Sequence, residues 1–176
     1  ASVSDWLEIR PAESMRIGKR PFSVEVFADR WRTGSRRGAG VTMAAEGWPR
    51  PRADGGFDFK GTWKVGTNVW ALAERLVVRD ARQATYALEV RPPTPTDIDC
   101  FWLKGIFSKD DWRKEGATFD GKRVDLKDGR RVVLPDVKTV SLPAAGGRVT
   151  LRGAFSVGIE DISQTSYAPD SLCVQI

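Results

Sequence analysis

Short segments of alternating apolar and polar residues, separated by turn residues, constrain the fold of this chain more than any other feature. In residues 57–65 the large apolar side chains fall on one side of an extended chain and the charged ones on the other. This period of two is typical of a half-buried strand. About ten such segments, with little sign of helix, predict an all-β fold: an antiparallel two-sheet β-sandwich, jelly-roll-like. The predicted strands lie within residues 22–26, 40–44, 57–65, 69–79, 85–91, 98–104, 117–126, 130–134, 149–159 and 171–176.

Two Asp-Gly pairs mark the sharpest predicted turns, because this dipeptide readily adopts the left-handed backbone of a tight hairpin. Asp120-Gly121 predicts a hairpin between residues 117–119 and 123–126, and Asp128-Gly129 predicts a second turn just before the next strand. A length of 176 residues is typical of one domain. We therefore expect a single β-sandwich domain over residues 1–176.

The chain has no histidine, which excludes several kinds of site at once. Ser-His-Asp and Cys-His catalysis and histidine-ligated zinc all need an imidazole. No apolar run reaches the roughly 18 residues of a membrane-spanning helix, so no membrane partner is expected. Cys100 and Cys173 lack a CxxC partner. They could form one disulfide in a secreted chain or remain two separate buried thiols.

Tryptophan is over-represented, with seven in the chain. Trp63 lies on the apolar side of its predicted strand and is expected in the core. Trp31, Trp48 and Trp112 instead lie in polar, turn-rich segments. A bulky ring exposed on a loop is costly unless it contacts a ligand, and an indole face stacks well on the C–H face of a sugar. We predict that these three tryptophans bind ligand; the alternative is that each is a loop anchor folded back onto the sandwich edge.

Positive charge is concentrated in residues 29–52, which contain six arginines and only two acidic residues. Such a cluster is attracted to anionic polymers, although most charge runs are simply solvated surface. We predict that Arg36, Arg37, Arg50 and Arg52 contribute hydrogen bonds or charge pairing to a ligand. Nucleic acid is not the expected partner, because no RNA-recognition or cold-shock motif is present.

Carboxylates give an alternative, catalytic interpretation. A glycosidase needs two of them roughly 5–10 Å apart across a cleft, and a lyase would use an arginine and a tyrosine near one. Tyr167 is the tyrosine expected outside the core, and we include it among the predicted ligand-binding residues. Scattered aspartates are better explained as turn formers, so no catalytic residue is predicted. The same carboxylates leave a structural calcium open, although no EF-hand spacing is present. The carboxylates considered are Asp97, Asp99, Asp110, Asp111, Glu160, Asp161 and Asp170.

Residues 80–176 contain strand-like segments in a characteristic order. Tyr86-Ala-Leu-Glu-Val90 is followed by Phe101-Trp-Leu-Lys-Gly105, a hairpin at Gly121-Lys-Arg-Val, Val132-Val-Leu-Pro135, Val149-Thr-Leu-Arg-Gly-Ala-Phe-Ser-Val157, Glu160-Asp161 and a closing strand. This order resembles the ancillary β-sandwich modules, including carbohydrate-binding modules, of bacterial polysaccharide-degrading glycoside hydrolases. The resemblance rests on layout and transfers no binding residue.

The resemblance implies a non-catalytic module that binds a plant-type polysaccharide and targets an attached glycoside hydrolase to it. It also implies a secreted or periplasmic location and no cofactor. Because the chain ends inside the strand-like run 171–176, we expect a piece of a larger multidomain enzyme. Two alternatives remain open: a structural spacer packed on a catalytic domain, and a β-sandwich glycosidase or lyase with paired carboxylates.

Overall fold

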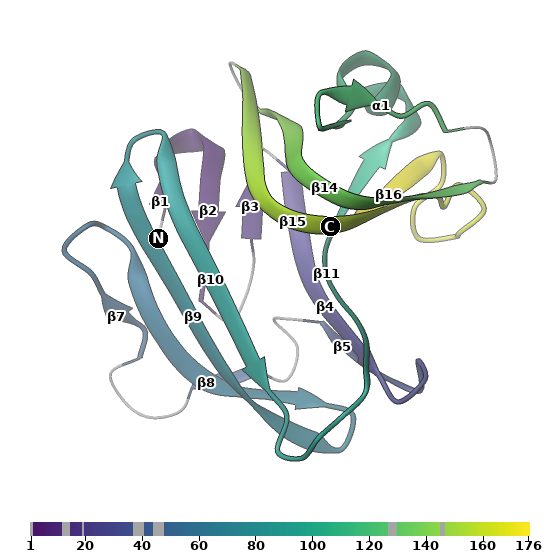
Figure 1. Cartoon of the computed structure of the whole chain (residues 1–176). Helices are drawn as coiled ribbons and strands as arrows, with labels where there is room; N and C mark the ends of the chain where they lie inside the picture. The colour runs from purple at the N-terminus through teal and green to yellow at the C-terminus, as the bar shows by residue number, and fades with distance from the viewer. Residues whose placement is uncertain are drawn as a thin grey trace. The chain divides into compact units, whose positions relative to one another are not determined.

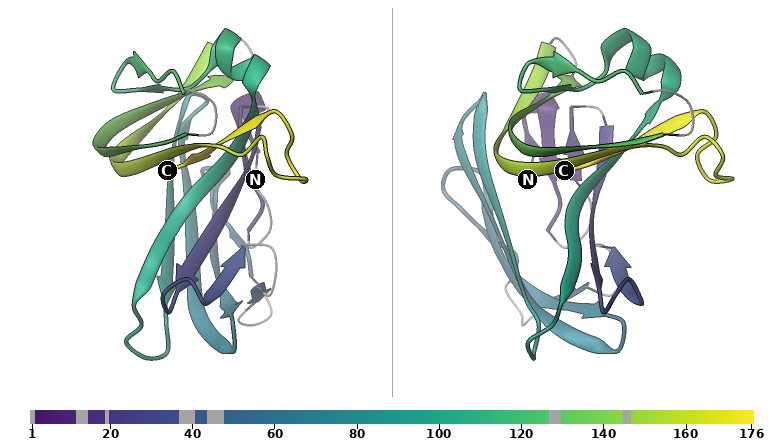
Figure 2. Two further views of the ribbon diagram at one scale, coloured as in Figure 1. Left: turned by 90° about the vertical axis from the view of Figure 1, so that its right-hand side faces the viewer. Right: turned by 45° about the vertical axis from the view of Figure 1, so that its right-hand side comes forward.

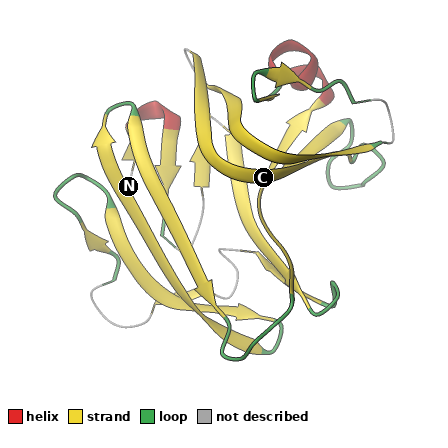
Figure 3. Cartoon of the chain, viewed as in Figure 1, coloured by secondary structure: helices red, strands yellow, loops and turns green. Residues whose placement is uncertain are grey.

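The computed structural model describes residues 2–11, 15–18, 20–36, 41–43, 48–126, 130–144 and 147–176. Strands account for 66% of the structure and helices for 6% (Figure 1, Figure 3). The strands form two antiparallel sheets. The predicted all-β, two-sheet antiparallel fold with little helix is therefore confirmed.

The chain divides into two compact units. The first holds residues Ala1–Met15 and Ser23–Phe101, and the second holds Arg16–Phe22 and Trp102–Ile176. Three strands contribute residues to both units: β3 (Met15–Ile17), β4 (Arg20–Ala28) and β11 (Ile98–Ser108). A single domain over the whole chain stays a prediction.

The first unit contains the smaller sheet, whose strands follow the order β10-β9-β8-β6 with β7 also paired to β8. Its three long strands lie side by side in every view (Figure 2). Residues 57–65 form one of these strands, as predicted. The ambiguous segment 69–79 is also strand, as we expected. The strands are β6 (Val41–Met43), β7 (Arg50–Pro51), β8 (Phe57–Val65), β9 (Asn68–Asp80) and β10 (Gln83–Arg91).

One face of this sheet is buried and the other is open to solvent. On β8 the apolar set predicted to face inward is buried, and the intervening charged residues are half-buried or exposed. Trp63 and Trp70 are paired across β8 and β9, and both are fully buried. The Trp63 indole Nε1 donates to Ser35 Oγ at 2.8 Å. Ser35 lies on β5 (Thr33–Arg36), which pairs with β4 in the other sheet, so the two sheets contact each other inside this unit.

The N-terminal segment also belongs to the first unit. It forms β1 (Ser2–Val3), the 3-10 turn η1 (Ser4–Trp6) and β2 (Leu7–Ile9), with β1 and β2 paired. The Trp6 indole Nε1 donates to the Ala81 carbonyl at 2.9 Å. This bond fixes η1 to the turn between β9 and β10.

In the second unit, the strands follow the order β11-β16-β15-β14-β12-β13. The hairpin predicted at Asp120-Gly121 is confirmed, because both residues have positive φ and join β12 to β13. Asp128-Gly129 lies outside the described residues. The elements are α1 (Lys109–Glu115), β12 (Thr118–Phe119), β13 (Lys122–Arg123), β14 (Arg131–Ala144), β15 (Gly147–Asp161) and β16 (Ser171–Gln175).

Residues 109–115 form helix α1, where we predicted a polar loop. The Ser108 side chain caps the helix by accepting from the Asp111 backbone N–H at 3.0 Å. Acidic residues occupy the first turn and basic residues the last, which complements the helix dipole. The segment contains only one large apolar residue, so it lacks the repeating apolar stripe by which a helix is recognised in sequence.

Candidate functional site

The three tryptophans predicted to bind ligand differ in their environments. Trp31 is 54% exposed, Trp48 is half-buried and Trp112 is 5% exposed. The expectation that Trp112 is an exposed ring is therefore wrong. Trp31 and Trp48 remain accessible to a ligand, and both belong to the first unit.

Trp112 is part of the core of the second unit. Its ring meets Phe107 edge-on at 5.5 Å between centroids and packs near Phe119 at 6.5 Å. Its indole Nε1 donates to the Val124 carbonyl at 3.1 Å. Arg123 in turn donates to the Trp112 carbonyl at 2.7 Å. These contacts are those of the alternative we considered, in which the tryptophan anchors its segment against the strands.

The four arginines predicted to bind ligand also differ in their environments. Arg37 and the side chain of Arg36 lie outside the described residues. Arg50 is exposed, and its guanidinium lies 4.3 Å from the centroid of the Trp48 ring. Arg52 instead forms ion pairs with Asp54 at 3.1 Å and with a second aspartate on β8. Arg50 is therefore the described member of the set that lies beside an accessible aromatic ring.

Tyr167 belongs to the second unit and is 65% exposed. It lies in the turn segment before β16, and the Lys104 ammonium is 6.0 Å from its ring centroid. Its exposure agrees with the expectation that it lies outside the core. Cys100 and Cys173 are not joined by a disulfide, which agrees with the alternative of two separate thiols, although Cys173 is buried and Cys100 only half-buried.

Trp48 and Arg50 line an open hollow on the solvent-facing side of β8, β9 and β10. We call it the Trp48 hollow. Its volume is about 540 Å³. Short side chains make the room: Ala73 lies opposite Lys60 on one side and Glu89 on the other. The full lining is Trp48, Arg50, Asp58, Phe59, Lys60, Ala73, Glu74, Arg75, Ala87 and Glu89.

The alternation of inward and outward side chains along each strand determines where the polar groups of the hollow lie. Asp58 and Lys60 alternate with buried residues on β8, so they face outward. Arg75 on β9 lies opposite Asp58 in the register of the sheet, and Ala87 on β10 lies opposite Arg75. The outward position of Asp58 and Lys60 follows from the sequence pattern. Their cross-strand neighbours do not, because those depend on which strands pair and in what register.

Asp58 is held as a carboxylate by two arginines. Arg75 Nε donates to its Oδ1, and Arg52 Nη1 donates to its Oδ2 at 3.2 Å. The hydrogen bond from Arg75, with that from Arg52, lowers the pKa of Asp58 below its ordinary value. The pKa of Asp54 is also lowered, first by the Gly56 backbone N–H and then by Arg52. Both carboxylates are therefore ionised at neutral pH.

A second accessible ring lies on a strained turn in the same unit. Asp29, Arg30 and Trp31 all have left-handed backbone conformations, with φ of 56°, 57° and 64°. Such conformations are costly for residues other than glycine and persist only where surrounding contacts hold them. Here the Trp31 N–H donates to Asp99 Oδ2 at 2.8 Å, and the Asp29 N–H donates to the Asp97 carbonyl at 3.2 Å.

The Trp31 ring is supported from one side by Phe27, at 5.3 Å between centroids. Gly34 makes room for this pair. A Cβ at Gly34 would lie 2.6 Å from the Phe27 ring, so a larger residue would displace it. The turn thus holds the exposed Trp31 indole against the Phe27 ring.

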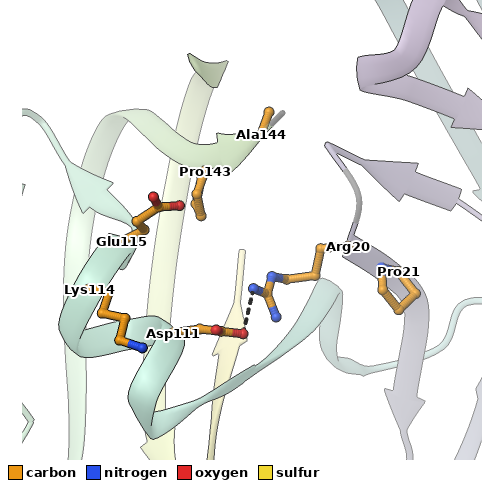
Figure 4. Close-up of a pocket in the computed structure, with 7 residues that line it drawn as sticks. All are labelled: Arg20, Pro21, Asp111, Lys114, Glu115, Pro143 and Ala144. Atoms are coloured by element: carbon orange, nitrogen blue, oxygen red, sulfur yellow. Dashed lines mark hydrogen bonds and ion pairs between the residues drawn. The ribbon is translucent and has the colours of Figure 1, made fainter. Parts of the chain in front are cut away.

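The second unit has a hollow of its own, of about 520 Å³, between Arg20 and helix α1 (Figure 4). Arg20 donates to Asp111 at 3.3 Å and to the Ile106 carbonyl at 2.9 Å, and its guanidinium lies 4.0 Å from the Phe107 ring centroid. The guanidinium is thus already engaged on three sides. The described lining of this hollow contains no aromatic ring that could stack on a ligand.

Metal sites and membrane-spanning helices are also absent from the described ranges. There, no group of three or more Cys, Asp or Glu side chains could hold a metal ion. None of the helices in the described part of the chain is long and apolar enough to cross a bilayer. Neither the known protein families, nor the curated proteins, nor the solved structures include a significant match to this chain.

Proposed function

We propose that the chain is a non-catalytic module that binds polysaccharide in the Trp48 hollow. The observation that carries this proposal is the combination of groups in one open depression. A partly exposed indole borders a floor of short side chains, with charged hydrogen-bonding groups around it. Sugars need an apolar surface for their ring and polar partners for their hydroxyls, and both are present here.

The state of the carboxylates favours binding over glycoside hydrolysis. A general acid needs a carboxyl group with a raised pKa, so that it is protonated at the working pH. Asp58 has a lowered pKa, and both of its oxygens accept from arginine. Glu74 also lines the hollow, but it is only 3% exposed and accepts from the Tyr86 hydroxyl at 3.1 Å.

As part of a larger secreted or periplasmic enzyme, such a module would keep an attached catalytic domain close to its substrate. Binding then acts by raising the effective concentration of polymer at the catalytic domain. The alternative of a structural spacer requires no ligand at all. A direct binding measurement separates the two.

The test is affinity electrophoresis of the chain through gels containing xylans, glucans, mannans or pectins, combined with tryptophan fluorescence. We expect at least one polymer to retard the wild-type chain. Trp48→Ala should abolish the retardation, and Trp31→Ala should leave it largely intact. Circular dichroism of both variants checks that each is folded. If Trp31→Ala abolishes the retardation and Trp48→Ala does not, the binding site lies at the strained turn instead. If no polymer retards the wild-type chain, the structural spacer is favoured.

A further inference from the structure

The charges around the Trp48 hollow fall into a paired set and an unpaired set. In the paired set, Asp54 and Asp58 form ion pairs with Arg52 and Arg75. Two negative charges meet two positive ones, so this group is neutral as a whole. Its arginines are engaged within the protein.

A further ion pair involves Glu89, the acidic lining residue on β10. Glu89 Oε1 accepts from Arg91 Nη2 at 2.7 Å on β10. This pair is also neutral and is exposed to solvent. Asp58 and Glu89 in the lining are thus each matched by an arginine. Glu74, also in the lining, is buried and accepts from the Tyr86 hydroxyl.

Arg50 and Lys60 make up the unpaired set. Within the described part of the chain, neither forms an ion pair with a carboxylate. Both instead lie beside the Trp48 ring, with the guanidinium 4.3 Å and the ammonium 5.9 Å from its centroid. The aromatic edge of the hollow therefore holds two cations that have no carboxylate partner among the described residues.

We propose that the Trp48 hollow recognises an acidic polysaccharide, with a sugar carboxylate bound between Arg50 and Lys60 while the ring contacts Trp48. This inference rests on the proposed function and names its ligand class. A guanidinium can hold a carboxylate through two parallel N–H···O bonds, and an ammonium adds a point charge. No ion pair among the described residues has to break for the carboxylate to enter.

A neutral polysaccharide would bind less tightly in the same hollow. It would contact the indole and the short side chains but leave Arg50 and Lys60 to water. Uronic-acid polymers differ from neutral ones by one carboxylate on each ring. Arg50 and Lys60 are the groups that would bind this additional carboxylate.

The experiment compares polygalacturonate with the same polymer fully methyl-esterified, in gels of equal concentration at low ionic strength. Esterification keeps the sugar ring and the backbone and removes the charge. The proteins are wild type, Arg50→Gln, Lys60→Gln and Lys64→Gln. Lys64 also faces solvent on β8 but lies four residues further along the strand, about 13 Å away, so its variant is a matched control for charge.

We expect the wild-type chain to bind polygalacturonate more tightly than the ester, with a preference that weakens as salt is added. Arg50→Gln and Lys60→Gln should each weaken binding to polygalacturonate roughly two- to fivefold, as is usual for exposed charge pairs. Binding to the ester should be unchanged in both. Lys64→Gln should behave as wild type toward both polymers.

Equal binding of the acid and the ester would overturn the inference and leave the proposed function standing. Binding of neither, together with no binding of any other polysaccharide, would remove the proposed function itself. Poly-L-glutamate, which has carboxylates but no sugar rings, is the third polymer. Binding to it as tight as to polygalacturonate would also overturn the inference, because it would show simple attraction to any polyanion.

Discussion

The strained turn at residues 29–32 allows a quantitative test of how much backbone strain the first unit carries. Arg30 is exposed and has a φ of 57°. Its side chain forms no ion pair with another described residue that a substitution would remove. A left-handed conformation costs a residue with a Cβ about 1–2 kcal/mol. Glycine avoids that cost but loses about 0.4–1 kcal/mol more chain entropy on folding than alanine does.

The difference between these terms predicts that Arg30→Gly is more stable than Arg30→Ala by about 0.5–1 kcal/mol. The alanine variant is the matched control, because it loses the same charge and side chain but keeps the Cβ. Urea unfolding followed by circular dichroism gives the two free energies of unfolding. The expected shift in melting temperature is about 1–4 °C for a chain of this size. Equal stabilities, or a less stable glycine variant, would show that the turn is not strained at Arg30.

Three further predictions concern the cores of both units and the hairpin of the second unit. Trp112→Ala should lower the free energy of unfolding by about 3–5 kcal/mol, the usual range for removing a buried large aromatic ring, and unchanged stability in urea would contradict its burial. Ser35→Ala should cost about 1–3 kcal/mol, because it leaves the buried Trp63 indole N–H without its acceptor, whereas Ser156→Ala at an exposed site should be neutral. Asp120 accepts mainly from the Thr139 backbone N–H, which lowers its pKa. Its stabilising effect is therefore complete above its unfolded pKa of about 4 and is lost as the pH falls through the lower folded value. Wild type and Asp120→Asn should differ in stability near neutral pH and converge in acid, and a constant difference down to pH 2 would argue against this hydrogen bond.

The elements that could be predicted from sequence are those specified by local patterns. The strand at residues 57–65 alternates over its whole length, and the hairpin at Asp120-Gly121 has a dipeptide suited to positive φ. Helix α1 was also signalled locally, by Ser108 three residues before Asp111. This capping signal consists of a single residue pair. The polar residues that follow it, 109–115, favour a loop when they are considered alone.

Burial of the tryptophans could not be predicted in the same way. Trp31, Trp48 and Trp112 all have charged residues of both signs within two positions along the chain, yet they range from 54% to 5% exposed. Trp112 is buried because Phe107 and Phe119, on two different strands, approach it in space. Such an approach depends on helix and strand packing, which leaves no trace in the residues next to the tryptophan.

The arginine-rich segment illustrates the same limit for charge. Arg50 and Arg52 are two residues apart and count equally in the net charge of the sequence. In the folded chain Arg52 is neutralised by aspartates that follow within six residues, while Arg50 lies against the Trp48 ring without an acidic partner in the described part of the chain. Lys60, from outside the arginine-rich segment, joins it because β7 and β8 are paired. A count of charges along the sequence therefore does not distinguish the ion-paired Arg52 from Arg50, and it leaves out Lys60. The pairing of strands decides which positive charges remain available to a ligand.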